Sequence, residues 1–257
     1  MKIWYQSYVD YENGASYWDA LQIHLNEVIS PGTKIDIKGI TPFDSYAHPL
    51  VEFRCAREMI ANAIKAEREG YDAVIVGHIQ DSGLYEARSA VDIPIIALGE
   101  ATMLYCCQMG QHLGIVTINP RFIPGFRHQI EKYGLHKRVT GVHSMTFEPG
   151  QILEAYGNDI KATEVKKLFE EQARPLVAAG TDVLIPGGGI PMLLFSQFRD
   201  HFVDGTPVIN GIPIAVKMAE MMVELRGLPG QFISRTSDYV KVPPEIVEEF
   251  INHPKGL

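Results

Sequence analysis

Short apolar runs rich in valine and isoleucine recur along the chain, and they are continuous rather than alternating with polar residues. Such runs are typical of parallel strands that are buried on both faces of a sheet. They predict two sets of strands. The first set is Lys2 to Gln6, Lys34 to Ile40, Ala73 to Val76 and Ile93 to Ala97, and the second is Leu113 to Thr117, Val139 to Val142, Val183 to Pro186 and Pro207 to Ile209.

Helical patterns separate most of these runs. Apolar residues spaced three and four apart predict helices at Val51 to Glu69, Asp159 to Ala179 and Ile212 to Leu225, and a short helix at Glu245 to Phe250 in the tail. A strand followed by a helix, repeated along the chain, predicts a parallel sheet with helices on both of its faces.

One segment is repeated with little change. Gly70-Tyr-Asp-Ala-Val-Ile-Val-Gly77 returns as Gly180-Thr-Asp-Val-Leu-Ile-Pro-Gly187, and each copy ends its apolar run on glycine. The sequence therefore predicts an α/β fold of two pseudo-symmetric halves, each a four-stranded parallel sheet flanked by helices, with an active cleft between them. We expect residues 1–102 plus 210–257 to form the first half and residues 103–209 to form the second.

Composition narrows the class of partner. The 257 residues carry a formal net charge of −8 without a basic cluster, which argues against nucleic acid and anionic membranes as partners. No apolar run has the length of a membrane span, and the first residues do not resemble a signal peptide, so we expect a cytoplasmic protein. Cys55, Cys106 and Cys107 show no metal or redox spacing and are expected to be small buried side chains.

The loops at the carboxyl ends of the strands are the expected site, because open α/β sheets bind ligands there. His78 directly follows Gly77, and its ordinary pKa of about 6.5 suits an acid or base near neutrality. Asp81 and Glu100 are further catalytic candidates. Two structural alternatives stay open for them, an N-cap at Asp81 and a first-turn acid that suits the helix dipole at Glu100.

Other loop residues are expected to bind the substrate. The Gly187-Gly-Gly189 run offers backbone N–H groups to an anion or a carbonyl oxygen, although a tight turn that needs glycine for positive φ would look the same. The full set of expected substrate-binding residues is Gln6, Ser7, His48, Thr117, Asn119, Gly187, Gly188 and Gly189.

A metal site is an alternative to acid–base chemistry. His48, His78, Asp81 and Glu100 offer nitrogen and oxygen ligands, but the histidines have no close H-x-H or H-x-x-x-H spacing. We therefore expect neither a metal nor a cofactor.

The combined motifs resemble the aspartate/glutamate racemase superfamily, and its hydantoin racemase branch in particular. The resemblance rests on Asp72 to Arg88, Val91 to Ala101 and Leu113 to Thr117, and on the late segment Val208 to Glu220 with the Pro243-Pro244 tail. It implies two α/β halves with the substrate between them and an assembly of several identical subunits.

The resemblance also implies a departure. Racemases of this superfamily use two cysteines as opposed acid and base, and those positions hold His78 and Gly188 in this chain. Two-base chemistry through thiols is therefore absent. We expect one-base lyase or hydrolytic chemistry, desulfurisation included, on a hydantoin-like ring (cyclic ureide or thiohydantoin) or a carboxylate, with His78 as acid or base. True racemisation of hydantoins or amino acids, metal-assisted hydrolysis and non-catalytic binding of a small molecule remain alternatives.

Overall fold

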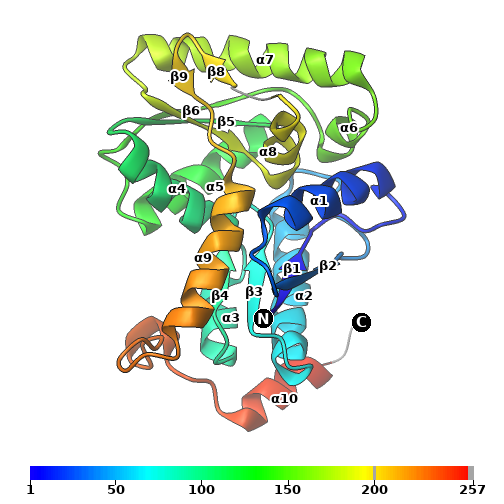
Figure 1. Cartoon of the computed structure of the whole chain (residues 1–257), viewed down its shortest axis with the longest axis vertical. Helices are drawn as coiled ribbons and strands as arrows, with labels where there is room; N and C mark the ends of the chain where they lie inside the picture. The colour runs from blue at the N-terminus through cyan, green and yellow to red at the C-terminus, as the bar shows by residue number, and fades with distance from the viewer. Residues whose placement is uncertain (199–200, 254–257) are drawn as a thin grey trace.

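Two parallel sheets, one in each half of the molecule, organise the computed structural model, which describes residues 1–198 and 201–253 (Figure 1). The first sheet has the strand order β2-β1-β3-β4. Its strands are β1 (Lys2–Gln6), β2 (Lys34–Lys38), β3 (Ala73–Val76) and β4 (Ile95–Ala97). This sheet confirms the four predicted strands, with β2 and β4 each two residues shorter than expected.

The second sheet has three strands in the order β6-β5-β7, so the prediction of four strands in each half is wrong here. The strands are β5 (Leu113–Thr117), β6 (Val139–Ser144) and β7 (Val183–Gly187). Where a fourth was expected, Val208 makes a single parallel bridge to Leu184. Pro207 has no N–H to continue the ladder, and the residues before it form a separate antiparallel pair, β8 (Phe202–Val203) with β9 (Thr206–Pro207).

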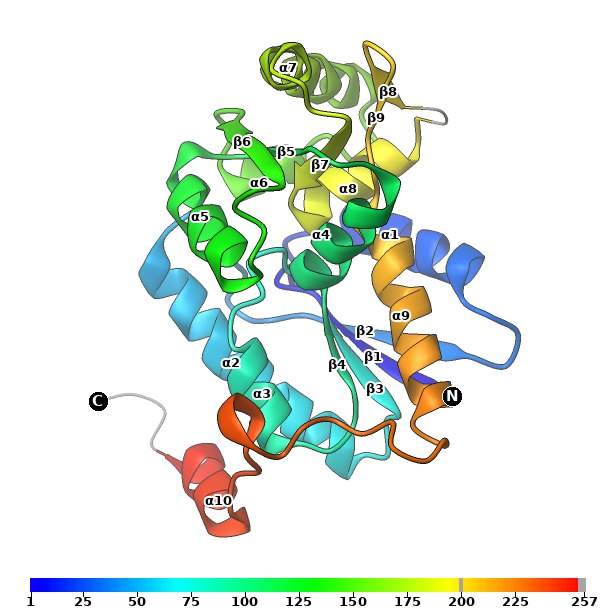
Figure 2. The same ribbon diagram turned by 90° about the vertical axis from the view of Figure 1, so that its left-hand side faces the viewer.

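Helices cover both faces of each sheet, as the alternation of strands and helices predicts (Figure 2). In the first half, α2 and α3 lie on one side of β3 and β4 while α9 lies on the other. The α-helices are α1 (Ala15–Val28), α2 (Pro49–Arg68), α3 (Leu84–Ala90), α4 (Leu98–Met109), α5 (Ile123–Lys132), α6 (Pro149–Leu153), α7 (Asp159–Ala178), α8 (Gly189–Ser196), α9 (Gly211–Leu225) and α10 (Pro244–Asn252). Two short 3₁₀ turns are η1 (Pro120–Phe122) and η2 (Ser237–Tyr239).

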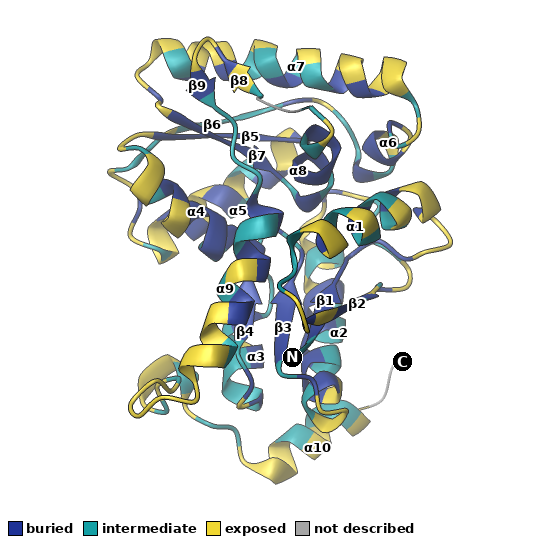
Figure 3. Cartoon of the chain, viewed as in Figure 1, coloured by how far each residue is buried: buried dark blue, intermediate teal, exposed yellow. Residues whose placement is uncertain are grey.

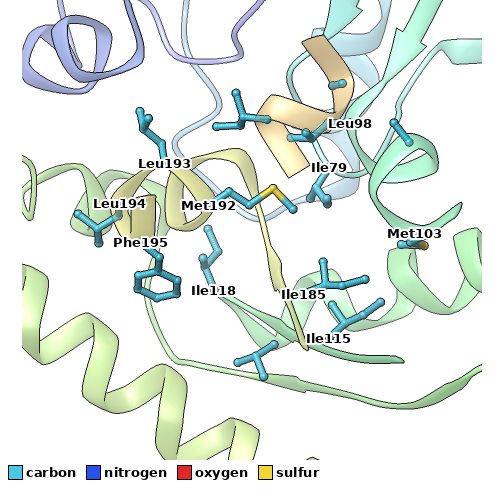
Figure 4. Packing of buried hydrophobic residues seen from close by; sticks show 14 of the residues in the cluster. Ile79, Leu98, Met103, Ile115, Ile118, Ile185, Met192, Leu193, Leu194 and Phe195 are labelled. Carbon is cyan, nitrogen blue, oxygen red and sulfur yellow. The ribbon is translucent and has the colours of Figure 1, made fainter. Parts of the chain in front are cut away.

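The central strands β1, β3, β5 and β7 and the edge strand β4 are almost entirely buried, whereas β2 and β6 are partly exposed (Figure 3). One apolar cluster includes residues of both halves. At the junction, the side chain of Met192 on α8 points toward Ile79 and Leu98 of the first half (Figure 4). Burial of such side chains stabilises a fold by about 25 cal/mol per Å² of apolar surface, so the halves are held together by their shared core. No helix within residues 1–198 and 201–253 is both long and apolar enough for a membrane span.

A buried carboxylate joins α9 to the loop that precedes β2. Glu220 accepts hydrogen bonds from the Ser30 N–H at 2.7 Å, the Ser30 hydroxyl at 2.8 Å and the Lys217 ammonium group at 2.8 Å. Burial by itself would raise the pKa of Glu220, but these contacts outweigh burial and lower the pKa to about 2. Because an unfolded glutamate titrates near pH ~4.3, the contact stabilises the fold above that pH and is lost as the pH falls toward 2.

Replacing Glu220 by glutamine should lower the free energy of unfolding at pH 7 by about 2 kcal/mol, because it removes a charged acceptor whose pKa is depressed. Urea unfolding at several pH values measures the loss, which should shrink steadily below pH ~4. Glu224→Gln, at an exposed acid one turn along α9, is the matched control and should change stability by less than about 0.5 kcal/mol. An equal loss at every pH would contradict the role of the charge.

Candidate active site

A partly enclosed cavity lies between the halves, at the carboxyl ends of β3 and β7. The first half contributes His78 and the second contributes the glycine run to opposite sides. The lining residues are Tyr8, Val9, Tyr17, Asp44, Gly77, His78, Ile79, Ile118, Phe122, Pro149, Gly187, Gly188, Gly189, Ile190 and Pro191.

Glycine ends both strands because neighbouring strands lie too close for a side chain. A Cβ at Gly77 would stand 2.5 Å from the ring of Tyr5 on β1. A Cβ at Gly187 would stand 2.9 Å from the Cα of Thr117 on β5. None of the glycines of the 187–189 run has φ in the left-handed region, and Gly188 is extended at φ 167°, so the alternative of a turn that needs glycine for its backbone angles is wrong.

The helix that follows the glycine run points its N-terminus at the cavity. The N–H of Gly188 is already used, because it donates to the Pro186 carbonyl oxygen at 2.9 Å. The N–H groups of Gly189 and Ile190 have no acceptor within α8, as at any helix start, and Pro191 has no N–H at all. Two adjacent donors on the second half are therefore available to a carbonyl oxygen or an anion.

His78 is fixed on the opposite side by two neighbours. Its Nε2 lies 2.9 Å from both carboxylate oxygens of Glu52, and the ring stacks flat on Tyr8 with 4.3 Å between centroids. Burial alone would lower the pKa of His78, but the Glu52 carboxylate outweighs burial and raises the pKa above its usual value. Nδ1 makes no hydrogen bond to another described residue, so it is the nitrogen open to a ligand.

Glu52 is a candidate site residue that the sequence did not predict. It stands in the first turn of α2, whose start is capped by His48 through a bond from the Leu50 N–H to Nδ1 at 3.1 Å. Ser82 donates to the second Glu52 oxygen at 2.9 Å. The same carboxylate faces a larger groove on the other side of His78, between α2 and α5.

Asp44 is the second missed residue. Its side chain is 5% exposed and lines the cavity, and one carboxylate oxygen, Oδ1, has no hydrogen-bond partner among the described residues. Burial raises the pKa of Asp44 to about 7, helped by Glu52 and opposed by His78. Both acids lie beyond the carboxyl end of β2. Ligands bind beyond the carboxyl ends of strands in open α/β sheets, so this segment is where the sequence could have indicated them.

Asp81 lies outside the residues that line the cavity. It is 2% exposed, and its oxygens accept the N–H groups of Gly99 and Glu100 at 2.7 Å each, the Tyr133 hydroxyl at 2.6 Å and the Gln129 amide at 3.1 Å. Asp81 therefore caps the start of α4 and not the start of α3, the helix that follows Asp81 in the chain. Its bonds to Gln129 and Tyr133 also connect the His78 loop to α5.

Glu100 is also directed away from the cavity. Its carboxylate pairs with Arg88 at 2.5 and 3.0 Å, an arrangement in which the guanidinium also bonds Tyr239. The structure thus provides Glu100 with a cation partner and places Glu52, rather than Glu100, beside His78.

The remaining expected binding residues divide between the cavity wall and its supports. Gly187, Gly188 and Gly189 line the cavity. The others lie behind it, because their polar groups bond the backbone or a neighbouring side chain: Gln6 bonds Lys38, Ser7 bonds Val9, Thr117 bonds Gly187, Asn119 bonds Phe147 and caps η1, and His48 caps α2.

The four residues of the alternative metal site do not come together. His48 caps α2, Asp81 caps α4, and Glu100 pairs with Arg88. Instead, Asp44, Glu52 and His78 bring one donor atom each to within 4.8 Å of one another. These three could hold a cation. None of Cys55, Cys106 and Cys107, all of them described, lines the cavity.

Known proteins resemble the chain over most of its length. The family model described as Asp/Glu/Hydantoin racemase matches residues 20–219. A hydantoin racemase of a Pseudomonas species (strain NS671) is 27% identical over 164 residues, which are 63% of this chain and 62% of that protein. The chain therefore matches less than two thirds of the length of that relative.

Solved structures show the same fold. The allantoin racemase of Pseudomonas fluorescens superposes with a TM-score of 0.77 at 24% identity, over 95% of this chain and 98% of that one. The allantoin racemase of Klebsiella pneumoniae gives a TM-score of 0.76 at 22% identity, over 95% and 94%. With a family match that extends across both halves, the chain belongs to the Asp/Glu/hydantoin racemase family.

Proposed function

We propose that the protein is an enzyme that converts a small hydantoin-like ring, a cyclic ureide or thiohydantoin, or a small carboxylate, without using thiols. The reaction is lyase or hydrolytic chemistry with one proton-transfer centre. The observation that carries the proposal is the pairing across one cavity of His78, held by Glu52, with the N-terminus of α8.

The residues that line the cavity support a small, partly polar ring as substrate. Val9, Ile118 and Phe122 provide apolar surface, while donors and acceptors are confined to a few positions. Such a combination is typical of sites that hold one small molecule in one orientation. Relatives named hydantoin racemase and allantoin racemase support a cyclic ureide in particular.

The geometry supports a different task for each side of the cavity. A ring carbonyl or thiocarbonyl directed at Gly189 and Ile190 would accept their N–H groups, which stabilise negative charge as it develops on that atom. His78 would then take or give the proton through Nδ1, with Glu52 holding the other nitrogen and the orientation of the ring. Nothing on the second side has to move a proton.

The second side also lacks room for a thiol. A Cβ at Gly188 would stand 2.9 Å from Cδ of the Pro191 ring, closer than such atoms approach in proteins, and 3.2 Å from its Cγ. A cysteine at this position would need α8 to shift. This supports ring-opening or elimination over inversion of a stereocentre.

Replacing His78 by asparagine should reduce turnover by about 10²–10⁴-fold, the usual contribution of an acid–base group. Glu52→Gln should cause a smaller loss, because the imidazole stays but is no longer held by a charge. Steady-state kinetics with a panel of hydantoins and thiohydantoins measures both. His136→Gln, at an exposed histidine, is the control and should match the wild type. Undiminished turnover in His78→Asn would remove the proposal.

Reactions run in deuterated water should separate conversion from racemisation. With an enantiopure 5-substituted hydantoin we expect the ring to be consumed. The remaining substrate should lose its configuration and its α-proton no faster than it does with heat-inactivated protein. NMR and chiral chromatography measure the two. Rapid deuterium incorporation with loss of configuration would establish the alternative, a true racemase.

A further inference from the structure

The side chains around His78 converge more closely than an acid–base pair requires. Donor atoms of Asp44, Glu52 and His78 all lie within 4.8 Å of one another. Ligands about 2.1 Å from one metal ion stand about 3.4 Å apart in a tetrahedral site. In an octahedral site they stand about 3.0 Å apart when adjacent and about 4.2 Å apart when opposite. The 2.9 Å between Nε2 of His78 and each Glu52 oxygen matches the adjacent spacing, so a small movement of Asp44 completes the set.

An unsatisfied oxygen points to a ligand independently of this spacing. Asp44 lines the cavity and is only 5% exposed. Its Oδ1 accepts no hydrogen bond from any described residue. A buried acceptor without a partner destabilises the folded protein. A cation between Asp44 and Glu52 would supply that partner and would relieve the repulsion between two neighbouring carboxylates.

The surroundings hold the donors as the outer residues of a metal site do. Ser82 donates to Oε2 of Glu52 at 2.9 Å, which fixes the carboxylate. Tyr8 lies flat against the imidazole, with ring planes 2° apart, which fixes its rotation. Such outer contacts orient ligands and sustain affinity.

We propose that Asp44, Glu52 and His78 bind a divalent first-row transition-metal ion, through Nε2 and one oxygen of each carboxylate. One imidazole and two carboxylates suit Zn²⁺, Mn²⁺ or Fe²⁺ and leave further positions of the ion open to water. The inference rests on the proposed function for the place of the substrate. In the ion-free protein His78 is the base; with the ion bound, a water on the ion is the nucleophile and His78 is a ligand.

The reaction that this site favours is hydrolysis with no change of oxidation state. The water oxygen bonds to a ring carbonyl carbon, and the ring C–N bond breaks. One water proton goes to the leaving nitrogen and the other stays with the new carboxyl group. The ion lowers the pKa of its water and so prepares the nucleophile near neutral pH.

Calorimetric titration of chelator-treated protein with Zn²⁺, and separately with Mn²⁺, tests the site. We expect one ion per chain, and binding weaker by at least about 10²-fold in Asp44→Asn and in Glu52→Gln. Glu131→Gln, which alters an exposed carboxylate 4.0 Å from His136, controls for surface binding and should bind like the wild type. Circular dichroism checks that each variant folds, and the visible bands of bound Co²⁺ should disappear in His78→Asn.

Absent binding, or equal binding in the wild type, Asp44→Asn and Glu52→Gln, overturns the metal site. These readouts do not depend on turnover, so the two proposals can fail separately. Stoichiometric binding that needs all three residues, together with turnover that does not need His78, would support the metal site and refute the proposed function. Turnover that needs His78 in a protein that binds no ion would do the reverse.

Discussion

The two halves meet where there is no room for a methyl group. A Cβ at Gly189 would lie 2.8 Å from the carbonyl oxygen of Gly77, so the start of α8 rests directly on the end of β3. This approach sets the width of the cavity, because the residues that follow each glycine form its two sides. The apolar contacts of Met192 with the first half act at the same junction (Figure 4). A gap of an ångström already loses much of the packing energy between two groups. The spacing of the two sides of the cavity therefore depends on the contact between Gly77 and Gly189.

The internal duplication is clear in the sheets and weak in the site. The order β2-β1-β3-β4 corresponds to β6-β5-β7 followed by the bridge at Val208. The loop after β2 carries Asp44 to the cavity and leads into α2 with Glu52. The corresponding loop after β6 leads into α6, where Glu148 pairs with Arg121 at 2.9 Å instead. Equivalent backbone thus supports acids around His78 in one half and bare N–H groups in the other.

The sequence predicted the fold far better than the site. Continuous apolar runs are a direct result of burial on both sheet faces, which is why β1, β3, β5 and β7 were found nearly residue for residue. The last strand failed because Thr206 to Ile209 has strand-like composition, and only the tertiary arrangement decides whether it pairs. Among site residues, His78 and the glycines were found because they directly follow buried strands. Asp81 and Glu100 also lie in segments that follow buried strands. However, the bond from Gly99 to Asp81 and the ion pair of Arg88 with Glu100 direct both carboxylates away from the cavity.

Glu52 shows why the rest of the site could not be read. It is one acid in the first turn of a helix, a position where an acid is common for electrostatic reasons alone. Its function depends on a contact with a residue 26 positions away. No pattern in a single sequence reports such a contact, whereas the binding of ligands beyond strand ends at least restricts the search to a few loops.

The ring of Pro191, which packs against Gly188, limits which side chains residue 188 can carry. Most single substitutions in an enzyme can be reversed by another, but a thiol at residue 188 would have to appear together with a change at Pro191. Neither change alone gives a better two-base racemase: the first strains the helix and the second offers no new chemistry. The side chain at residue 188 and the one three positions along the chain are therefore coupled, and a thiol can be engineered into this cavity wall only by changing both residues together.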